Sequence, residues 1–373
     1  MSRLPSLTGL RFVAAGMVFF FHAAYENLFA DPTAQGVFMG IFSQGGWTGV
    51  GFFFILSGFV LTWSSRPTDT TTRFWRRRFF KVYPNHLVTY VIALVLLLAT
   101  GVAVDAGDAI LNLFLLQSWS PSLATEVSIN PVAWSLSVEA LFYLSFPFWI
   151  KLVRRIPAGR LWAWAIGIMA VVWLVPFAAH LLPSEPKPFF APISEWQFWF
   201  VYVLPPMRVL DFVLGMLLAQ IVLKKKWINL GILPAMGLVV VGYLLPHVLP
   251  WEFRLVATTV VPLALLIAAV ASADVEGKWS PFRSRTMVWL GDISFALYLW
   301  HRLTLYYGNQ LLGGGSWSTP AALGVLALLF GATILLSWVL FKFVEQPIMK
   351  NWASPRRKPL EPSAQVNPTG AAV

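Results

Sequence analysis

The chain has 373 residues, of which 58% are hydrophobic and only 12% are charged, whereas about a quarter of the residues in a soluble domain are charged. A single soluble core of this size cannot hide so much apolar surface, so the composition indicates a membrane protein. The chain has no cysteine, which excludes disulfides, thiolate metal sites and a cysteine nucleophile. The net charge of +11 fits either a nucleic-acid partner or basic loops that orient a membrane protein, and the positions of the charges decide between them.

Ten apolar runs have the length of about 17–25 residues with which a helix crosses a bilayer. The first run is followed by small residues as in a signal peptide, but Arg11 and His22 flank its apolar part, so we interpret it as a retained helix. The sequence therefore predicts an all-α, polytopic membrane domain over residues 1–352, with about ten transmembrane helices. The predicted spans are 7–28, 46–64, 84–102, 134–152, 161–182, 204–223, 228–249, 254–273, 287–311 and 320–344.

The loops between these runs alternate in charge, as expected when Lys and Arg remain in the cytoplasm. This pattern predicts a multi-pass protein of the plasma membrane with both termini in the cytoplasm, and it makes the basic excess an orientation signal, so no nucleic-acid partner is expected. Residues 353–373 are rich in Pro, Ala and basic residues and are predicted to form a disordered cytoplasmic tail. The basic residues assigned to the cytoplasm are Arg3, Arg66, Arg73, Arg76, Arg77, Arg78, Lys81, Lys151, Arg154, Arg155, Arg160, Lys224, Lys225, Lys226, Lys278, Arg283, Arg285, Lys350, Arg356, Arg357 and Lys358.

The many Trp and Phe residues are expected mainly on the lipid-facing surface and in interfacial belts. Trp162 and Trp164, and Trp196 and Trp199, are examples. We therefore do not expect an aromatic substrate cage.

Ionisable residues inside the predicted spans are candidate functional residues, because each costs about 2.5–3.5 kcal/mol in the bilayer. Arg208 and Asp211, three residues apart, are expected to form a local ion pair that lines a polar cavity. His301 alone is typical of a packed, hydrogen-bonded histidine, and no metal site is predicted. The complete set is Arg11, His22, Glu139, Arg208, Asp211, Asp292, His301 and Arg302.

His22 and Glu139 are predicted at similar depth, because they lie about six and about five residues from the external ends of their helices. A neutral imidazole beside a carboxylate suits a general base, and it suits equally well a hydrogen bond that only fastens two helices. Arg11 and His22 are eleven residues apart, close to three full helical turns, so they share one face about 16 Å apart. A thin ligand with an anionic head and a reactive tail fits this face.

The segment from Arg73 to Lys81 is strongly basic and lies at the cytoplasmic mouth of the third predicted span. As an anchor that follows the positive-inside pattern it needs no further function. As a site for nucleotide phosphates it is equally well placed, because guanidinium groups bind phosphate through paired hydrogen bonds. The residues alone leave both interpretations open.

Six motifs in the chain resemble, in the same order, those of the acyltransferase 3 family of integral membrane O-acyltransferases. They are Leu7-Thr-Gly-Leu-Arg11 continued by Phe19-Phe-Phe-His22 (Arg-x10-His), Phe52-Phe-Phe-Ile-Leu-Ser-Gly-Phe59, Arg76-Arg-Arg-Phe-Phe-Lys-Val-Tyr-Pro84, Trp134-Ser-Leu-Ser-Val-Glu139 followed by Phe142-Tyr143, Tyr298-Leu-Trp-His301 and Phe343-Val-Glu-Gln-Pro347. The chain departs from this resemblance at Gly51, where many relatives have Asp, at Lys81, where Arg is frequent, and at Asn85-His86, where Tyr is frequent.

The resemblance implies an acyl-CoA-dependent O-acyltransferase that transfers a short acyl group, such as acetyl or propionyl, to a hydroxyl group. It implies His22 as the catalytic base, with Glu139 orienting or balancing the charge of the imidazole, and no permanently bound cofactor. The opening segment looks most similar to the actinobacterial branch that acylates macrolide and ansamycin antibiotics, so the expected acceptor is a macrolide or other polyketide antibiotic, or a carbohydrate. The implied coenzyme A contacts are Arg11, Arg76, Arg77, Arg78 and Lys81.

A different class of protein is also considered, namely a transporter or flippase of an amphiphilic glycan or antibiotic. Its aqueous cavity would be lined by Arg208, Asp211 and His301. The sequence shows no inverted repeat, which weighs against this class. For the enzyme, Trp300 and His301 are candidates for stabilising the oxyanion, and with Arg208 and Asp211 they form the predicted substrate pocket. The sequence does not predict an oligomeric state.

Overall fold

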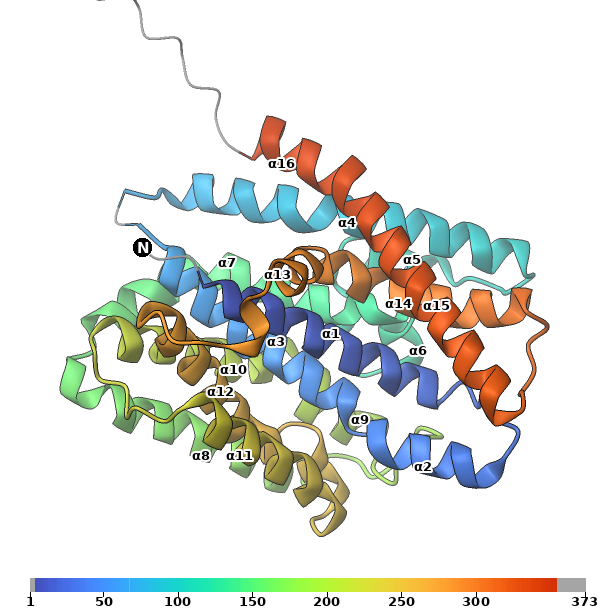
Figure 1. Cartoon of the computed structure of the whole chain (residues 1–373), viewed down its shortest axis with the longest axis horizontal. Helices are drawn as coiled ribbons and strands as arrows, with labels where there is room; N and C mark the ends of the chain where they lie inside the picture. The colour runs from blue at the N-terminus through green and yellow to red at the C-terminus, as the bar shows by residue number, and fades with distance from the viewer. Residues whose placement is uncertain (1–3, 67, 354–373) are drawn as a thin grey trace, which may run out of the picture.

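The computed structural model describes residues 4–66 and 68–353, and the long helices of these segments run lengthwise beside one another (Figure 1). The predictions for Arg3, Arg356, Arg357, Lys358 and the tail from 354 onward lie outside the described residues. The α-helices are α1 (Pro5–Ala24), α2 (Pro32–Phe42), α3 (Gly45–Ser64), α4 (Thr71–Ala99), α5 (Ala106–Leu113), α6 (Leu123–Glu126), α7 (Trp134–Arg155), α8 (Leu161–Ala179), α9 (Glu195–Phe198), α10 (Pro205–Leu223), α11 (Ile232–Leu244), α12 (Ala257–Val275), α13 (Arg285–Asp292), α14 (Ser294–Leu311), α15 (Thr319–Leu340) and α16 (Gln346–Trp352).

Within the described residues, eight helical segments are long and apolar enough to cross a membrane, so the protein is an all-helical, polytopic membrane protein. Two of the ten predicted spans do not meet this criterion. The run 228–249 forms the shorter apolar helix α11, which continues to His247. The run 287–311 is divided at Ile293 into α13 and α14, and α14 carries His301, Arg302 and Asn309.

The third predicted span, 84–102, begins too late. Helix α4 starts at Thr71, whose preceding residue Thr70 accepts a hydrogen bond from the backbone N–H of Arg73, and it continues through Pro84. The basic segment is therefore the first part of a 29-residue helix. Arg and Lys are good helix formers, and a threonine N-cap satisfies one of the free amides at the start of the helix.

Helices α3 and α10 pack backbone against backbone behind the site. A Cβ atom on Gly58 would lie 1.8 Å from the carbonyl oxygen of Phe212, and one on Gly215 would lie 1.9 Å from that of Ile55. Only glycine fits at these contacts, and small residues at helix crossings are typical of membrane proteins. Helix α1 packs on α3, and α7 packs on α10, so these four helices form a common frame.

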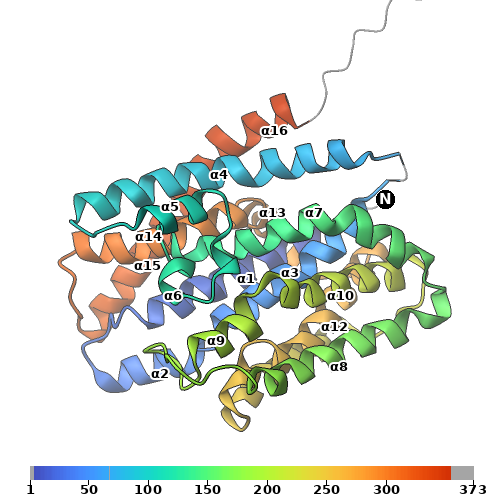
Figure 2. The ribbon, with the colours of Figure 1, turned by 180° about the vertical axis from the view of Figure 1, so that it is seen from behind.

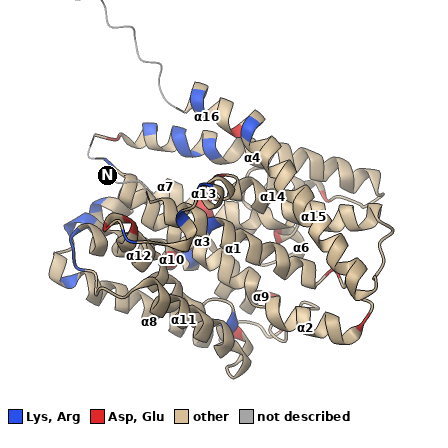
Figure 3. Ribbon diagram, viewed as in Figure 1, with Lys and Arg blue, Asp and Glu red and all other residues tan. Residues whose placement is uncertain are grey.

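The charged residues are distributed unevenly along the bundle. Figure 3 shows most Lys and Arg at the end where the chain begins and where α4 starts and α16 lies. The short helices α5, α6 and α9 lie toward the other end, as seen from behind in Figure 2. The two ends of the bundle thus differ in chemistry.

Candidate active site

Three cavities between the described helices share their walls and form a series. The first, here called the basic cavity, has a volume of about 480 Å³ and lies where α3 ends and α4 begins. The middle cavity, of about 160 Å³, shares Leu61 and Arg78 with it. The aromatic chamber, of about 520 Å³, shares Val50 and Tyr298 with the middle cavity. The series leads from the basic end of the bundle toward the other end.

His22 lies on α1 and lines the aromatic chamber. Its Nδ1 is 2.9 Å from the carbonyl oxygen of Val18 and 3.1 Å from Nε2 of His301, while Nδ1 of His301 is 2.5 Å from the carbonyl oxygen of Tyr298. A carbonyl only accepts, so in the neutral rings both Nδ1 atoms carry the hydrogen, and Nε2 of His301 is an acceptor for His22. Nε2 of His22 therefore keeps its lone pair, as a general base requires.

His301 on α14 is fully buried and holds the ring of His22. It was predicted as a packed histidine or a wall of a substrate pocket, and it lines none of the three cavities. The sequence gives no signal for the contact, because the two histidines are 279 positions apart. Trp300 also lines none of these cavities.

Glu139 on α7 does not form the expected hydrogen bond with His22. Its Oε2 accepts a hydrogen bond of 2.9 Å from the hydroxyl of Tyr143, and its side chain lines the middle cavity with Arg11. Glu139 and His22 were predicted at similar depth in the membrane, but depth does not determine which helices are neighbours. At the level of His22, helix α1 contacts α14. Glu139 thus belongs with the cations of the middle cavity.

The predicted coenzyme A contacts divide into three groups. Arg11, Arg78 and Lys81 line the middle cavity, and Lys81 forms an ion pair with Glu345 at the end of the π-helical turn Phe341–Glu345. Arg78 also lines the basic cavity, together with Arg77. Arg76 lines neither cavity, because its Nε donates a hydrogen bond of 2.7 Å to the carbonyl oxygen of Trp352.

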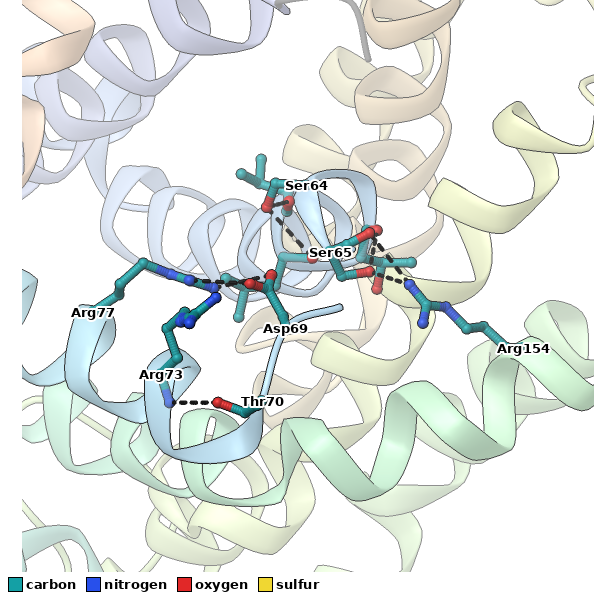
Figure 4. A network of polar contacts seen from close by, with 10 residues as sticks. Ser64, Ser65, Asp69, Thr70, Arg73, Arg77 and Arg154 are labelled. Carbon is teal, nitrogen blue, oxygen red and sulfur yellow. Dashed lines mark hydrogen bonds and ion pairs between the residues drawn. The ribbon is translucent and has the colours of Figure 1, made fainter. Parts of the chain in front are cut away.

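The basic cavity contains further cations that were predicted only as orientation signals. Arg66, Lys151 and Arg154 line it, and Arg154 donates a hydrogen bond of 2.6 Å to the hydroxyl of Ser65 (Figure 4). These cations form a site because the end of α7 lies beside the loop between α3 and α4. This arrangement is visible only in the folded structure.

Among the described residues, Asp69 is the one carboxylate that lines the basic cavity. It forms an ion pair of 3.0 Å with Arg77, drawn in Figure 4. Partial burial tends to raise the pKa of Asp69, but the hydrogen bond and the charge of Arg77 outweigh it, so the pKa lies below its usual value. Asp69 is therefore ionised at neutral pH and holds Arg77 in place.

Arg208 and Asp211 form the predicted ion pair, at 2.6 Å, and each side chain is 2% exposed. The guanidinium of Arg208 lies over the rings of Phe54 and Tyr202, 5.2 and 5.6 Å from their centres. Both residues face a void of only about 10 Å³, and they line none of the three cavities. The polar cavity expected for a transporter, lined by this pair and His301, is therefore not formed by the described residues.

The aromatic chamber was not expected. Its wall includes Trp47, Trp134 and Tyr202, and the ring of Tyr202 lies 4.8 Å from that of Trp47 and 4.9 Å from that of Trp134. Membrane-facing and cavity-lining aromatic residues have the same sequence pattern, so composition could not separate them. The charged residues in this wall are Glu126 and Arg302.

The fold and the cavities define a multi-pass membrane protein with a buried, histidine-containing site. Residues 4–342 match the family described as the acyltransferase domain, so the chain belongs to the acyltransferase 3 family and is an acyltransferase. It is 42% identical over 371 residues to acyltransferase MdmB of Streptomyces mycarofaciens, covering 96% of this chain and 94% of that protein.

More distant relatives are larger proteins. The chain is 23% identical to peptidoglycan O-acetyltransferase OatA of Listeria monocytogenes and 22% identical to O-acetyltransferase OatA of Staphylococcus aureus, over 93% of this chain in each case. It spans 56% and 57% of the length of these two proteins. No solved structure matches the chain.

Proposed function

We propose that the protein transfers a short acyl group, such as acetyl or propionyl, from acyl-CoA to a hydroxyl group of a macrolide or other polyketide antibiotic, or of a carbohydrate. The observation that carries this proposal is the free lone pair on Nε2 of His22, at the wall of a chamber that continues a series of cavities from the basic end of the bundle. The family relationship supports the acyl transfer.

The cavities provide a path for the donor. The phosphates of coenzyme A bind in the basic cavity, where Arg77, Arg78 and Arg154 supply guanidinium groups. The pantetheine arm extends through the middle cavity past Arg11 and Glu139, so that the thioester reaches His22. Coenzyme A is a substrate in this scheme, and no resident cofactor is needed.

The reaction is a direct transfer. The acceptor hydroxyl gives its proton to Nε2 of His22 while its oxygen attacks the thioester carbonyl carbon. The carbon–sulfur bond then breaks, the coenzyme A thiolate leaves, and it takes the proton back from the imidazolium. His301 positions the ring, and the charge of Glu139 acts from the middle cavity instead of by contact with His22.

The position of the cations suggests how the protein lies in the membrane. We place the basic end, with the start of α4 and with α16, in the cytoplasm of the cell, where acyl-CoA is available and where Lys and Arg are retained. Counting α11 and the α13–α14 pair as spans gives ten crossings of the plasma membrane and both termini on the cytoplasmic side.

The experiment that tests this function uses purified protein in detergent with radiolabelled acetyl-CoA or propionyl-CoA and a panel of macrolide and sugar acceptors. We expect labelled acceptor and free coenzyme A in equal amounts. The variant His22→Ala is expected to lose the transfer, and the control His247→Ala, on an exposed position, is expected to keep it. Transfer at the wild-type rate by His22→Ala contradicts the mechanism. For the same protein reconstituted into lipid vesicles, uptake of the acceptor without thioester cleavage contradicts the function in favour of transport.

A further inference from the structure

One carboxyl group in the wall of the aromatic chamber has no hydrogen bond or ion pair with the part of the chain that the structure describes. Glu126, at the end of α6, is 4% exposed and lines the chamber, and its side chain forms no hydrogen bond or ion pair within residues 4–66 and 68–353. The neighbouring charges are paired. Arg302 forms an ion pair with Glu26, and Glu195 accepts a hydrogen bond of 3.1 Å from the backbone N–H of Leu123. Among the described residues, Glu126 is therefore the charged group of this wall that remains to be satisfied by a ligand.

The surroundings of Glu126 define the chemistry of that ligand. The chamber wall contains Trp47, Trp134, Phe198 and Tyr202, and the ring of Phe198 lies 5.6 Å from that of Tyr202. Aromatic faces attract alkylated ammonium groups, and a buried carboxylate is stabilised by an opposite charge. A ligand that is only apolar would leave the carboxyl group unpaired, and a highly polar ligand would lose its hydration against the rings.

We propose that Glu126 and the aromatic rings of the chamber bind an alkylated ammonium group of the acceptor, so that the natural acceptor is a bulky, largely apolar alcohol carrying a basic amine. This proposal rests on the proposed function, because it takes the aromatic chamber as the place of the acceptor. Binding of the cation by the carboxylate then orients the reacting hydroxyl toward His22 on the same chamber wall.

The protonation of Glu126 follows from the groups around it. Burial, together with the nearby Glu195, raises the pKa of Glu126 to about 8. The other titratable groups that face it are Tyr202 and Tyr298, and Arg302 lines the same chamber. Below this pH the empty chamber holds a neutral carboxyl group, so binding of an ammonium ion releases one proton.

The test compares two ligands of similar size that differ in the charge of one nitrogen. The probes are a macrolide whose sugar carries a dimethylamino group and the derivative in which a formyl group replaces one of the two N-methyl groups, so that the nitrogen is an uncharged amide. Binding to the wild-type protein in detergent is followed by quenching of tryptophan fluorescence, which does not depend on turnover. We expect the amine to bind about tenfold more tightly or better, which is the effect of one buried charge contact.

The variant Glu126→Gln keeps the shape of the side chain and removes its charge. We expect it to weaken binding of the amine to the level of the amide and to leave the amide unchanged. The control Glu195→Gln, whose carboxylate does not line the chamber, is expected to keep the preference for the amine. The melting temperature and elution volume of each variant show whether it is folded.

Three outcomes overturn the proposal: equal binding of both probes by the wild-type protein, equal weakening of both by Glu126→Gln, or no change in that variant. If Glu126→Gln is not folded, the same comparison is made with Glu126→Asp, which is expected to retain the preference. A failure of the proposed function shows separately, as absence of acyl transfer from acyl-CoA to any hydroxyl acceptor while the two probes still bind with different affinity.

Discussion

The basic cavity and the aromatic chamber lie at opposite ends of one series of cavities and differ in how their charges are held. In the basic cavity several partly exposed cations share the wall, and Arg77 and Arg154 already have partners in the loop between α3 and α4. In the aromatic chamber Glu126 is buried and has no hydrogen bond or ion pair with any described residue. The many weak, exchangeable contacts of the basic cavity suit coenzyme A, which is the same donor in every reaction. The single buried carboxyl group of the aromatic chamber suits the selection of a particular acceptor.

The largest expected effect separates chemistry from donor binding. His22→Gln is expected to lower kcat by about 10²–10⁴-fold, because general base catalysis contributes that much. The dissociation constant for acyl-CoA is expected to change by less than about twofold, since the basic cavity is untouched. Single-turnover kinetics and equilibrium binding of a thioether analogue of acyl-CoA measure the two quantities. A large loss of acyl-CoA binding in this variant would mean that His22 and the basic cavity do not act independently.

The next effect concerns the aromatic chamber and pH. The pKa of Glu126 is raised to about 8, so between pH 6 and 8 the affinity for a cationic acceptor is expected to rise by about tenfold in total as the carboxylate ionises. It levels off above pH 8, where the carboxylate is already ionised. A quaternary ammonium derivative of the macrolide, which stays charged at every pH, is the ligand for this titration. A flat profile in the wild-type protein, equal to that of Glu126→Gln, contradicts the prediction.

A smaller effect is expected at the residue that the basic and middle cavities share. Arg78→Ala should raise KM for acyl-CoA by about 10–100-fold, the value of one charge-assisted hydrogen bond, with little change in KM for the acceptor. The matched control is Arg76→Ala, two positions earlier on the same helix, whose side chain lines neither cavity. Equal effects of the two substitutions would show that the cations act only through the overall charge.

The smallest effect is that of salt. Increasing the ionic strength from about 0.05 to about 0.5 M shortens the screening length of exposed charges severalfold. Binding of acyl-CoA is therefore expected to weaken by about three- to tenfold, and binding of the cationic acceptor by less than about twofold, because Glu126 is buried. The two dissociation constants are measured in the same salt series. An equal salt dependence would remove the distinction between the two ends.

Helical geometry alone allowed parts of the site to be predicted. The eleven-residue spacing placed Arg11 and His22 on one face of α1, and in the structure they line neighbouring cavities. The partner of His22 could not be predicted in this way, because it depends on the packing of α1 against α14. Glu126 could not be found either, since its four-residue helix has no periodic pattern and lies outside every predicted span.

The all-helical membrane fold could be predicted from composition and apolar runs, but the residues at which some helices begin and end could not. Basic residues at the start of α4 made this helix look shorter than it is, and the run 287–311 was predicted as one span although it divides at Ile293 into α13 and α14. A charged side chain costs free energy where it faces lipid. A helix that lines a cavity or extends beyond the bilayer can carry such residues without exposing them to the hydrocarbon. The functional helices are therefore those for which hydropathy is least informative.

The wall between the middle cavity and the aromatic chamber has a consequence for how the enzyme can change. The two cavities share Val50 and Tyr298, and the hydroxyl of Tyr298 is fixed by hydrogen bonds of 2.9 Å from Ser135 and 3.2 Å to the carbonyl oxygen of Val132. Because Tyr298 is held in place at this shared boundary, the short segments around α6 and α9 can accumulate substitutions without disturbing the donor half. New acceptors can thus be selected, in evolution or in a directed library, by varying these segments while the donor half and the catalytic histidines stay as they are.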